Sequence, residues 1–424
     1  MVGSRREFLV ATFSAGAAVL SLLGQIADAA TSHVKSATAI TQVFGTGQRL
    51  TAVAVEYDQA IDNSKLSLKS FSVKDRTVTK VYANSAATPA PNGTNGNFVI
   101  IEVSPDDKDA PLYLQVKRDV VRKDAKATIT RTGKVIAASG KTYAASSAAI
   151  NTTKITNLIV DDFKQLEYVD PKTKAGLKYN LFIPKNYDKS KTYPLVLFMH
   201  DAGATSPITN TTLVQGLGAV VWASPEEQAK QQAFVLAPQY STPVVNDKSE
   251  ASPDLDYTID LVNKLTGDYA IDKNRIYATG QSGGGMMTIA MNIKYPGLFA
   301  ASFIVAGQWD PAVVAPLAKD KMWIVVSQGD LKAYPGENAM TEVYEKQGAK
   351  VSRAVWSGRS TPKEFAAAVK KMQSEGNAIN YVALQKGTVV LPGQDDDGGG
   401  NHVNTWRIAY TIEGIRDWLF EQHK

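Results

Sequence analysis

A serine flanked by glycines is the residue whose surroundings suggest chemistry most directly. Gly280-Gln281-Ser282-Gly283-Gly284 fits the pattern G-x-S-x-G, which forms a nucleophile elbow where a strand turns sharply into a helix. A β-branched and aromatic run, 276–279, precedes it, and a helix is expected over 283–294. Small neighbours permit the turn, and the helix N-terminus favours developing negative charge. The pattern predicts that Ser282 is a nucleophile; the alternative is a glycine-rich turn without chemistry.

A serine hydroxyl is a poor nucleophile near neutral pH and needs a general base within hydrogen-bond reach. The chain has four histidines. His33 lies near the N-terminus, His423 is the penultimate residue, and His200 ends an apolar run and begins a loop. His402 precedes the expected last helix, and in chains with this elbow the order of the triad is serine, acid, histidine. Order and elimination therefore predict His402 as the base, with His200 as part of the scaffold of its loop.

The imidazole needs a carboxylate that orients it and stabilises its charged form. The apolar run 322–326 leads into Asp330, at a strand C-terminus where chemistry gathers in open α/β sheets. We predict Asp330 as this acid, with Asp310 as the second choice and a capping role as the alternative for Asp330. Asp395–Asp397 beside three glycines are expected to form a flexible solvated loop. A calcium site there is the weaker alternative, because a carboxylate cluster alone lacks the ordered ligand spacing of a known calcium loop, and no metal ligand is assigned.

The tetrahedral oxyanion needs two preorganised N–H donors. One is predicted to be the amide of Gly283, directly after the nucleophile. The other should come from the loop 200–203, after an earlier apolar strand. The Ala202 amide is favoured there, and the Asp201 amide is the alternative.

Two aromatic residues are candidates for the substrate pocket. Trp309 follows a strand expected near Ser282, and Tyr240 follows Pro238-Gln239 in a similar position. An aromatic ring there can form the wall of an acyl or alcohol pocket. Ordinary packing in the core is the alternative for both.

Length and composition limit the class of protein. A chain of 424 residues suggests two domains, and 44% hydrophobic with 21% charged residues is typical of a folded globular protein. The net charge of +5 is spread along the chain, which favours a solvated surface over a nucleic-acid face. The absence of cysteine from the sequence excludes disulfides, a thiol nucleophile and thiolate metal sites.

The N-terminal residues resemble an export signal. Arg5-Arg6 precedes an apolar run, 9–23, and the small-residue pattern Ala27-Asp28-Ala29. This predicts a twin-arginine signal peptide over 1–29 and a periplasmic or secreted protein. A retained anchor is the weaker alternative because the run is short for a membrane span, and no other stretch is long and apolar enough to cross a bilayer.

Short alternating strands separated by turn clusters predict a β-sandwich over 38–150, for example 50–57, 98–103 and 112–116. A segment rich in Ala, Ser, Asn and Thr, 144–156, is the expected boundary. From 157 to 424, continuous apolar strands alternate with helices. This predicts an α/β domain with a mostly parallel sheet and helices on both faces. The expected strands are 179–184, 195–199, 234–237 and 322–326, and the expected helices are 255–266, 283–294, 337–347 and 405–422.

These residues carry a resemblance to a known family. Residues 160–422 resemble the extracellular α/β-hydrolase esterases of the poly(3-hydroxybutyrate) depolymerase and feruloyl-esterase-like branch. Residues 40–150 resemble the immunoglobulin-like domain fused to some of these esterases, notably in Val53-Ala54-Val55-Glu56-Tyr57-Asp58. The matching catalytic pieces are 195–203, 275–285, Gly329-Asp330 with 333–336, and 414–420.

The resemblance implies a serine carboxylic-ester hydrolase without a cofactor. Ser282, Asp330 and His402 take the family's nucleophile, acid and base roles. The substrate is a small-molecule or polymer-linked ester whose acyl and alcohol parts are left open, as is the oligomeric state. Two alternatives remain: a serine peptidase of the prolyl-oligopeptidase type, and a binding protein with an inactive hydrolase fold.

Overall fold

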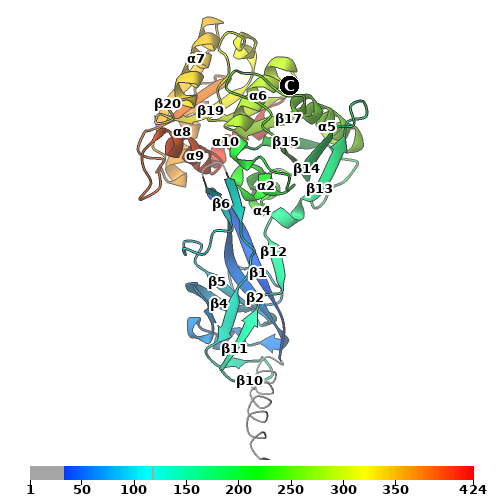
Figure 1. Cartoon of the computed structure of the whole chain (residues 1–424), viewed down its shortest axis with the longest axis vertical. Coiled ribbons are helices and arrows are strands. Elements are labelled where there is room, and N and C mark those ends of the chain that lie inside the picture. The colour runs from blue at the N-terminus through cyan, green and yellow to red at the C-terminus, as the bar shows by residue number, and fades with distance from the viewer. Residues whose placement is uncertain (1–32, 117–118) are drawn as a thin grey trace, which may run out of the picture. The chain divides into compact units, whose positions relative to one another are not determined.

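The computed structural model describes residues 33–116 and 119–424 (Figure 1). The predicted signal peptide, 1–29, lies outside the described residues. The chain forms two compact units. Within the described residues, the first unit holds the chain up to Thr41, Leu50–Leu112 and Lys123–Thr156, and the second holds Gln42–Arg49, Tyr113–Arg122 and Asn157–Lys424. Two pieces of the predicted sandwich, 42–49 and 113–122, thus belong to the second unit.

The first unit is built from strands, and the pairs β2–β5, β4–β5, β8–β11 and β3–β8 are antiparallel. A five-stranded sheet has the order β12-β1-β2-β5-β4, and a three-stranded sheet has the order β11-β8-β3. One core unites the two sheets, with Val55 of β2, Ile101 of β5 and Ile129 of β8 all fully buried. The strands are β1 (Val34–Phe44), β2 (Gly47–Ile61), β3 (Ser72–Val73), β4 (Val78–Asn84), β5 (Gly96–Val103), β8 (Thr128–Arg131), β9 (Val135–Ile136), β10 (Thr142–Tyr143), β11 (Ser146–Asn151) and β12 (Lys154–Asn157).

The segment predicted as the boundary, 144–156, is itself part of the first unit, whose last piece ends at Thr156. It contains β11 and most of β12, which pair with other strands in the two sheets of the first unit. Backbone pairing requires no apolar side chain, so a run of small and polar residues satisfies it at the edge of each sheet.

The second unit has a nine-stranded sheet in the order β13-β14-β16-β15-β17-β18-β19-β21-β20. The pairs β13–β14 and β14–β16 are antiparallel, and the others are parallel. Figure 1 shows β13 and β14 at one side of this sheet, and β19 and β20 toward the other. Its strands are β13 (Lys164–Val169), β14 (Gly176–Phe182), β15 (Tyr193–Met199), β16 (Phe234–Gln239), β17 (Ile271–Gln281), β18 (Ala301–Val305), β19 (Met322–Ser327), β20 (Val351–Trp356) and β21 (Ile379–Leu384), and the hairpin β6 (Tyr113–Val116) and β7 (Asp119–Arg122) also belongs to this unit.

The central strands are buried on both faces. Every residue of β15, β18, β19 and β21 is buried, as expected where helices cover a parallel sheet from both sides. The helices are α2 (Thr211–Val214), α3 (Leu217–Val220), α4 (Pro225–Lys230), α5 (Asp254–Asp268), α6 (Gly283–Lys294), α7 (Ala333–Lys346), α8 (Pro362–Gln373), α9 (Gly398–Ala409) and α10 (Glu413–Glu421). Among the described residues, no helix is both long enough and apolar enough to pass through a bilayer.

The prediction of a single helix over 405–422 was wrong. Two helices, α9 and α10, occupy this stretch, and the chain turns between them at 410–412. Arg416 donates a hydrogen bond to the Tyr410 carbonyl at 2.5 Å, which satisfies an acceptor at the end of α9. The first helix also starts earlier than expected, so His402 lies in its first turns and not on a loop.

Candidate active site

Ser282 occupies the turn between β17 and α6. Its backbone has φ 52° and ψ −119°, a strained conformation that is rare for a residue with a side chain. A Cβ on Gly284 would lie 1.9 Å from the Met199 carbonyl oxygen, and one on Gly280 would lie 2.3 Å from the Gly284 carbonyl carbon. The glycines of the motif are therefore needed because the backbones of β15, β17 and α6 approach one another closely.

The structure brings Ser282, His402 and Asp330 together. The Nε2 atom of His402 lies 2.8 Å from the Ser282 hydroxyl, and its Nδ1 atom lies 2.5 Å from Oδ2 of Asp330. The three residues come from the elbow after β17, the start of α9 and the segment after β19. The His402 side chain is 27% exposed and that of Asp330 only 2%, so the imidazole stands between a buried carboxylate and an accessible hydroxyl.

Asp330 is held in one orientation. Its Oδ1 accepts hydrogen bonds from the amides of Lys332 at 3.0 Å and Ala333 at 2.9 Å, which leaves Oδ2 for the imidazole. Burial by itself raises the pKa of this carboxyl, but the hydrogen bond and charge of His402, with the two amides, outweigh burial and lower the pKa below its ordinary value. The carboxylate therefore stays ionised and able to accept a hydrogen bond from Nδ1–H of His402.

A buried asparagine, which the sequence interpretation missed, joins the acid segment to the base helix. Asn401 is fully buried and accepts a hydrogen bond from the Ser327 hydroxyl at 2.8 Å. Its amide group donates to Asp396 at 2.6 Å. A Cβ on Gly329 would lie 2.2 Å from Asn401, so the neighbours of Asp330 and His402 pack directly on each other. The only sequence signal for this role is the position of Asn401 directly before His402.

The loop after β15 lies against the N-terminus of α6. The Ala202 amide nitrogen is 3.5 Å from the position of a Cβ on Gly283. Ala202 begins a 3-10 turn over Ala202–Ala204, and Gly283 begins α6. An N–H in a first helical position has no partner within its own helix, so both predicted donors can bind an oxyanion beside Ser282.

The side chains of Asp201 and His200 hold this loop in place through hydrogen bonds. Asp201 accepts hydrogen bonds from the Gly203 amide at 2.8 Å and from the Gln281 side chain at 2.9 Å. The latter contact, which sequence reasoning missed, joins the loop to the residue before Ser282. His200 is buried, its Nε2 accepts from the Tyr240 amide at 3.0 Å, and burial lowers the pKa of its imidazole. These contacts suit a neutral scaffold residue.

The other candidates lie apart from the Ser282–His402–Asp330 contact. Asp310 is exposed and accepts from the Ala312 amide at 2.9 Å, which is a turn contact. Trp309 is buried, and its backbone amide donates to the Met340 sulfur at 3.1 Å; it is not among the residues lining the cavity beside Gly283. Tyr240 does line that cavity, and its hydroxyl is 2.9 Å from that of Thr258.

The three acids before α9 are exposed and lie in no helix or strand, as predicted for a solvated loop, whereas the three glycines that follow them begin α9. Asp397 accepts from the Gly400 amide at 2.6 Å as the N-cap of α9, which offsets the poor helix propensity of the three glycines. Asp396 is bound to Asn401. Across residues 33–116 and 119–424, no cluster of three or more His, Asp or Glu residues has the arrangement of a metal site.

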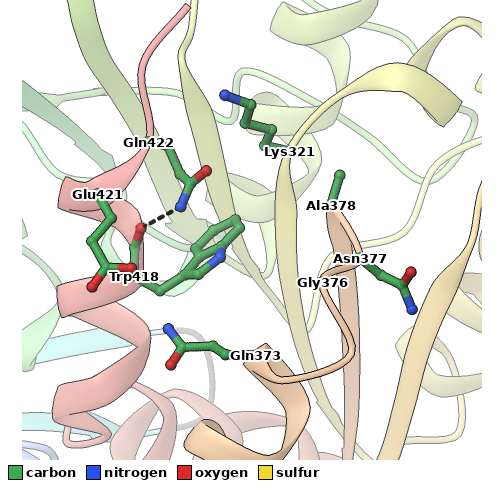
Figure 2. A pocket seen from close by; sticks show the side chains of 8 residues that line it. All are labelled: Lys321, Gln373, Gly376, Asn377, Ala378, Trp418, Glu421 and Gln422. Atoms are coloured by element: carbon green, nitrogen blue, oxygen red, sulfur yellow. Dashed lines mark hydrogen bonds between the residues drawn. The ribbon is translucent and has the colours of Figure 1, made fainter.

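A larger cavity of about 440 Å³ lies elsewhere in the second unit (Figure 2). Trp418 and Gln373 line it, together with Lys321 and Ala378, which directly precede β19 and β21. Ser282 and Asp330 follow the C-terminal ends of their strands, so this cavity lies at the opposite edge of the sheet. No serine or histidine is among its lining residues, so it supplies neither the nucleophile nor the base of a serine hydrolase.

Comparison with known proteins agrees with this architecture. Residues 36–144 match the family described as esterase Ig-like N-terminal domain. Residues 248–330, which include Ser282 and Asp330, match the prolyl oligopeptidase family. A solved structure of a thermostable esterase is 28% identical and covers 92% of this chain and 100% of its own, with a TM-score of 0.77.

The second unit has the α/β-hydrolase fold, and an immunoglobulin-like domain precedes it. The fold class predicted from the sequence is confirmed, as is the resemblance to esterases. This α/β-hydrolase is also similar to a probable feruloyl esterase C of Aspergillus terreus, with 30% identity over 31% of this chain and 47% of the relative. A poly(3-hydroxybutyrate) depolymerase of Ralstonia pickettii is 29% identical over 38% of this chain and 34% of its own. The matches thus span less than half the length of these curated relatives.

Proposed function

We propose that this α/β-hydrolase is a serine esterase that cleaves carboxylic esters through an acyl-enzyme. One observation carries the proposal: His402 lies within hydrogen-bond distance of both the Ser282 hydroxyl, at 2.8 Å, and the Asp330 carboxylate, at 2.5 Å. This is the arrangement that activates a serine as a nucleophile. The named esterases among the similar proteins support the ester as the bond cleaved.

The reaction follows from the positions of these groups. Ser282 Oγ attacks the ester carbonyl carbon while His402 Nε2 takes its proton, and Asp330 stabilises the imidazolium. The carbonyl oxygen becomes an oxyanion that the Gly283 and Ala202 amides bind. His402 then protonates the alcohol oxygen as the C–O bond breaks, which leaves an acyl group on Ser282. Water, deprotonated by His402, attacks this acyl-enzyme and releases the acid.

The test is replacement of the nucleophile. Ser282→Ala should abolish hydrolysis of a 4-nitrophenyl ester by the purified protein, because the variant has no hydroxyl at the position that His402 activates. The matched control is Ser147→Ala, at an exposed position in the first unit, and its kcat should equal that of the wild type. Turnover retained by Ser282→Ala would overturn the proposal.

A serine peptidase is the second candidate, because residues 248–330 match the prolyl oligopeptidase family. The esterase is preferred because the segment 36–144 matches an esterase-associated domain. Assay of 4-nitrophenyl esters and of prolyl-4-nitroanilide peptides on the same preparation separates the two. Greater kcat/KM on the peptides would favour the peptidase. Export by the twin-arginine route stays a prediction.

A further inference from the structure

A small cavity lies directly beside the two proposed oxyanion donors. Gly283 and Ala202 line it, with Met287 one turn farther along α6. The opposite wall comes from the segment after β16, where Val244 is buried and Val245 is half-buried. The cavity measures about 20 Å³. A single water requires about 10–15 Å³ measured in this way, so the space holds about one methyl group.

The wall of this cavity is held by backbone hydrogen bonds. The Ser252 amide donates to the Val244 carbonyl at 2.7 Å, and the Ser206 amide donates to the Tyr240 carbonyl at 3.0 Å. Tyr240 lines the cavity and is itself buried, with its hydroxyl 2.9 Å from that of Thr258. These contacts oppose outward movement of the wall, so the cavity limits the size of the group that it accepts.

The position of His402 decides which part of an ester enters the cavity. The alcohol oxygen must lie near His402 Nε2, because that atom supplies the proton for the leaving group. Ser282, His402 and Asp330 are not among the residues that line the cavity, whereas Gly283, directly after Ser282, and Ala202 are. With the carbonyl oxygen at these two amides, the alcohol points toward His402 and the acyl substituent points into the cavity.

We propose that this protein is selective for acetyl esters, with Val245 and Met287 as the residues that limit acyl length. The inference rests on the proposed esterase function. The methyl of an acetyl group fits the space, and each further methylene must displace the wall. Such a misfit changes kcat/KM by on the order of tenfold or more for each methylene. A feruloyl or 3-hydroxybutyryl group is larger than this space.

The wild-type protein tests the inference with 4-nitrophenyl acetate, butyrate and octanoate, which share one leaving group. Because butyrate has two more methylenes than acetate, we expect kcat/KM to be about a hundredfold higher for acetate, with octanoate lower still. Equal or rising values along the series, with acetate hydrolysed, would overturn the acyl-pocket assignment and leave the esterase intact. Failure to hydrolyse any of the three would overturn the proposed function itself.

A variant pair tests the wall. Val245→Ala removes two methyl groups at a half-buried position, and should raise the butyrate-to-acetate ratio of kcat/KM by about tenfold. Val355→Ala makes the same chemical change at an exposed position of β20, 59% exposed, and should leave the ratio unchanged. The role of Val245 would be contradicted if Val245→Ala left the butyrate-to-acetate ratio of kcat/KM unchanged. It would also be contradicted if both variants changed this ratio by the same factor.

Discussion

Replacement of Asp330 by asparagine removes the charge of the proposed acid and preserves its shape. The amides of Lys332 and Ala333 both donate to Oδ1 of Asp330, so the asparagine must turn its carbonyl oxygen toward them. Its NH₂ group then takes the place of Oδ2 and faces Nδ1 of His402. The NH₂ group of the asparagine and the Nδ1–H of His402 are both hydrogen-bond donors and cannot bind each other. Nδ1 must therefore lose its proton and accept the hydrogen bond.

The proton then resides on Nε2 of His402. That atom lies 2.8 Å from the Ser282 hydroxyl, to which it now donates instead of accepting, so the base is lost while the geometry remains. A change of tautomer of this kind lowers kcat by about 10⁴-fold in a serine hydrolase, which corresponds to about 5 kcal/mol of activation free energy. We expect this loss for Asp330→Asn with 4-nitrophenyl acetate at pH 7.5.

The control is Asp310→Asn, at the exposed position that was the second choice for the acid. Its kcat should remain within about twofold of the wild type, because its side chain is exposed and accepts a hydrogen bond from a turn amide. The melting temperature of both variants shows whether the fold persists. The reasoning fails if folded Asp330→Asn keeps more than about a tenth of the wild-type kcat, or if Asp310→Asn loses as much.

Three further changes test the surroundings of the site. Gly284→Ala puts a Cβ 1.9 Å from a carbonyl oxygen of β15 and should destabilise the fold by about 3 kcal/mol, measured by urea unfolding. Gly267→Ala, where a Cβ meets nothing within 4 Å, is the control, and equal effects would refute the close-approach argument. Asp201→Ala removes the side-chain acceptor for the Gly203 amide and should lower kcat about tenfold or more through a misplaced oxyanion donor; an unchanged kcat would contradict this. Glu337 is fully buried, and burial raises its pKa well above the ordinary value, so the folded state retains a proton that the unfolded state releases as pH rises. Stability is therefore lost above the unfolded pKa, and Glu337→Gln should have a higher free energy of unfolding than the wild type at pH 8, with the gap closing toward pH 4. A gap that does not vary with pH would refute the buried-acid interpretation.

The residues that the structure brings together were predictable because each has a strong local signal. Ser282 lies in a five-residue motif with a strand before it and a helix after it. His402 was reached by elimination, which worked because the chain has only four histidines. Asp330 follows a continuous apolar strand, and the C-terminal ends of parallel strands meet at one edge of a sheet.

The misses depended on hydrogen bonds and packing contacts that the residue types alone do not reveal. The start of α9 was taken for a flexible loop because three glycines have poor helix propensity, and the Asp397 cap that compensates for them is visible only as a hydrogen bond. The turn that separates α9 from α10 depends on the contact between Arg416 and the Tyr410 carbonyl. Asn401 and Gly329 pack on each other across more than seventy residues of sequence, and no local pattern marks such a pair.

The most direct test of the central claim is covalent trapping of the nucleophile. A fluorophosphonate probe reacts with a serine only where a base and an oxyanion hole activate it. Mass spectrometry of the digested wild-type protein should find one adduct, on the peptide that contains Ser282, and Asp330→Asn should slow its formation by orders of magnitude. An unlabelled protein, or an adduct on another serine, would contradict the claim that Ser282 is the nucleophile.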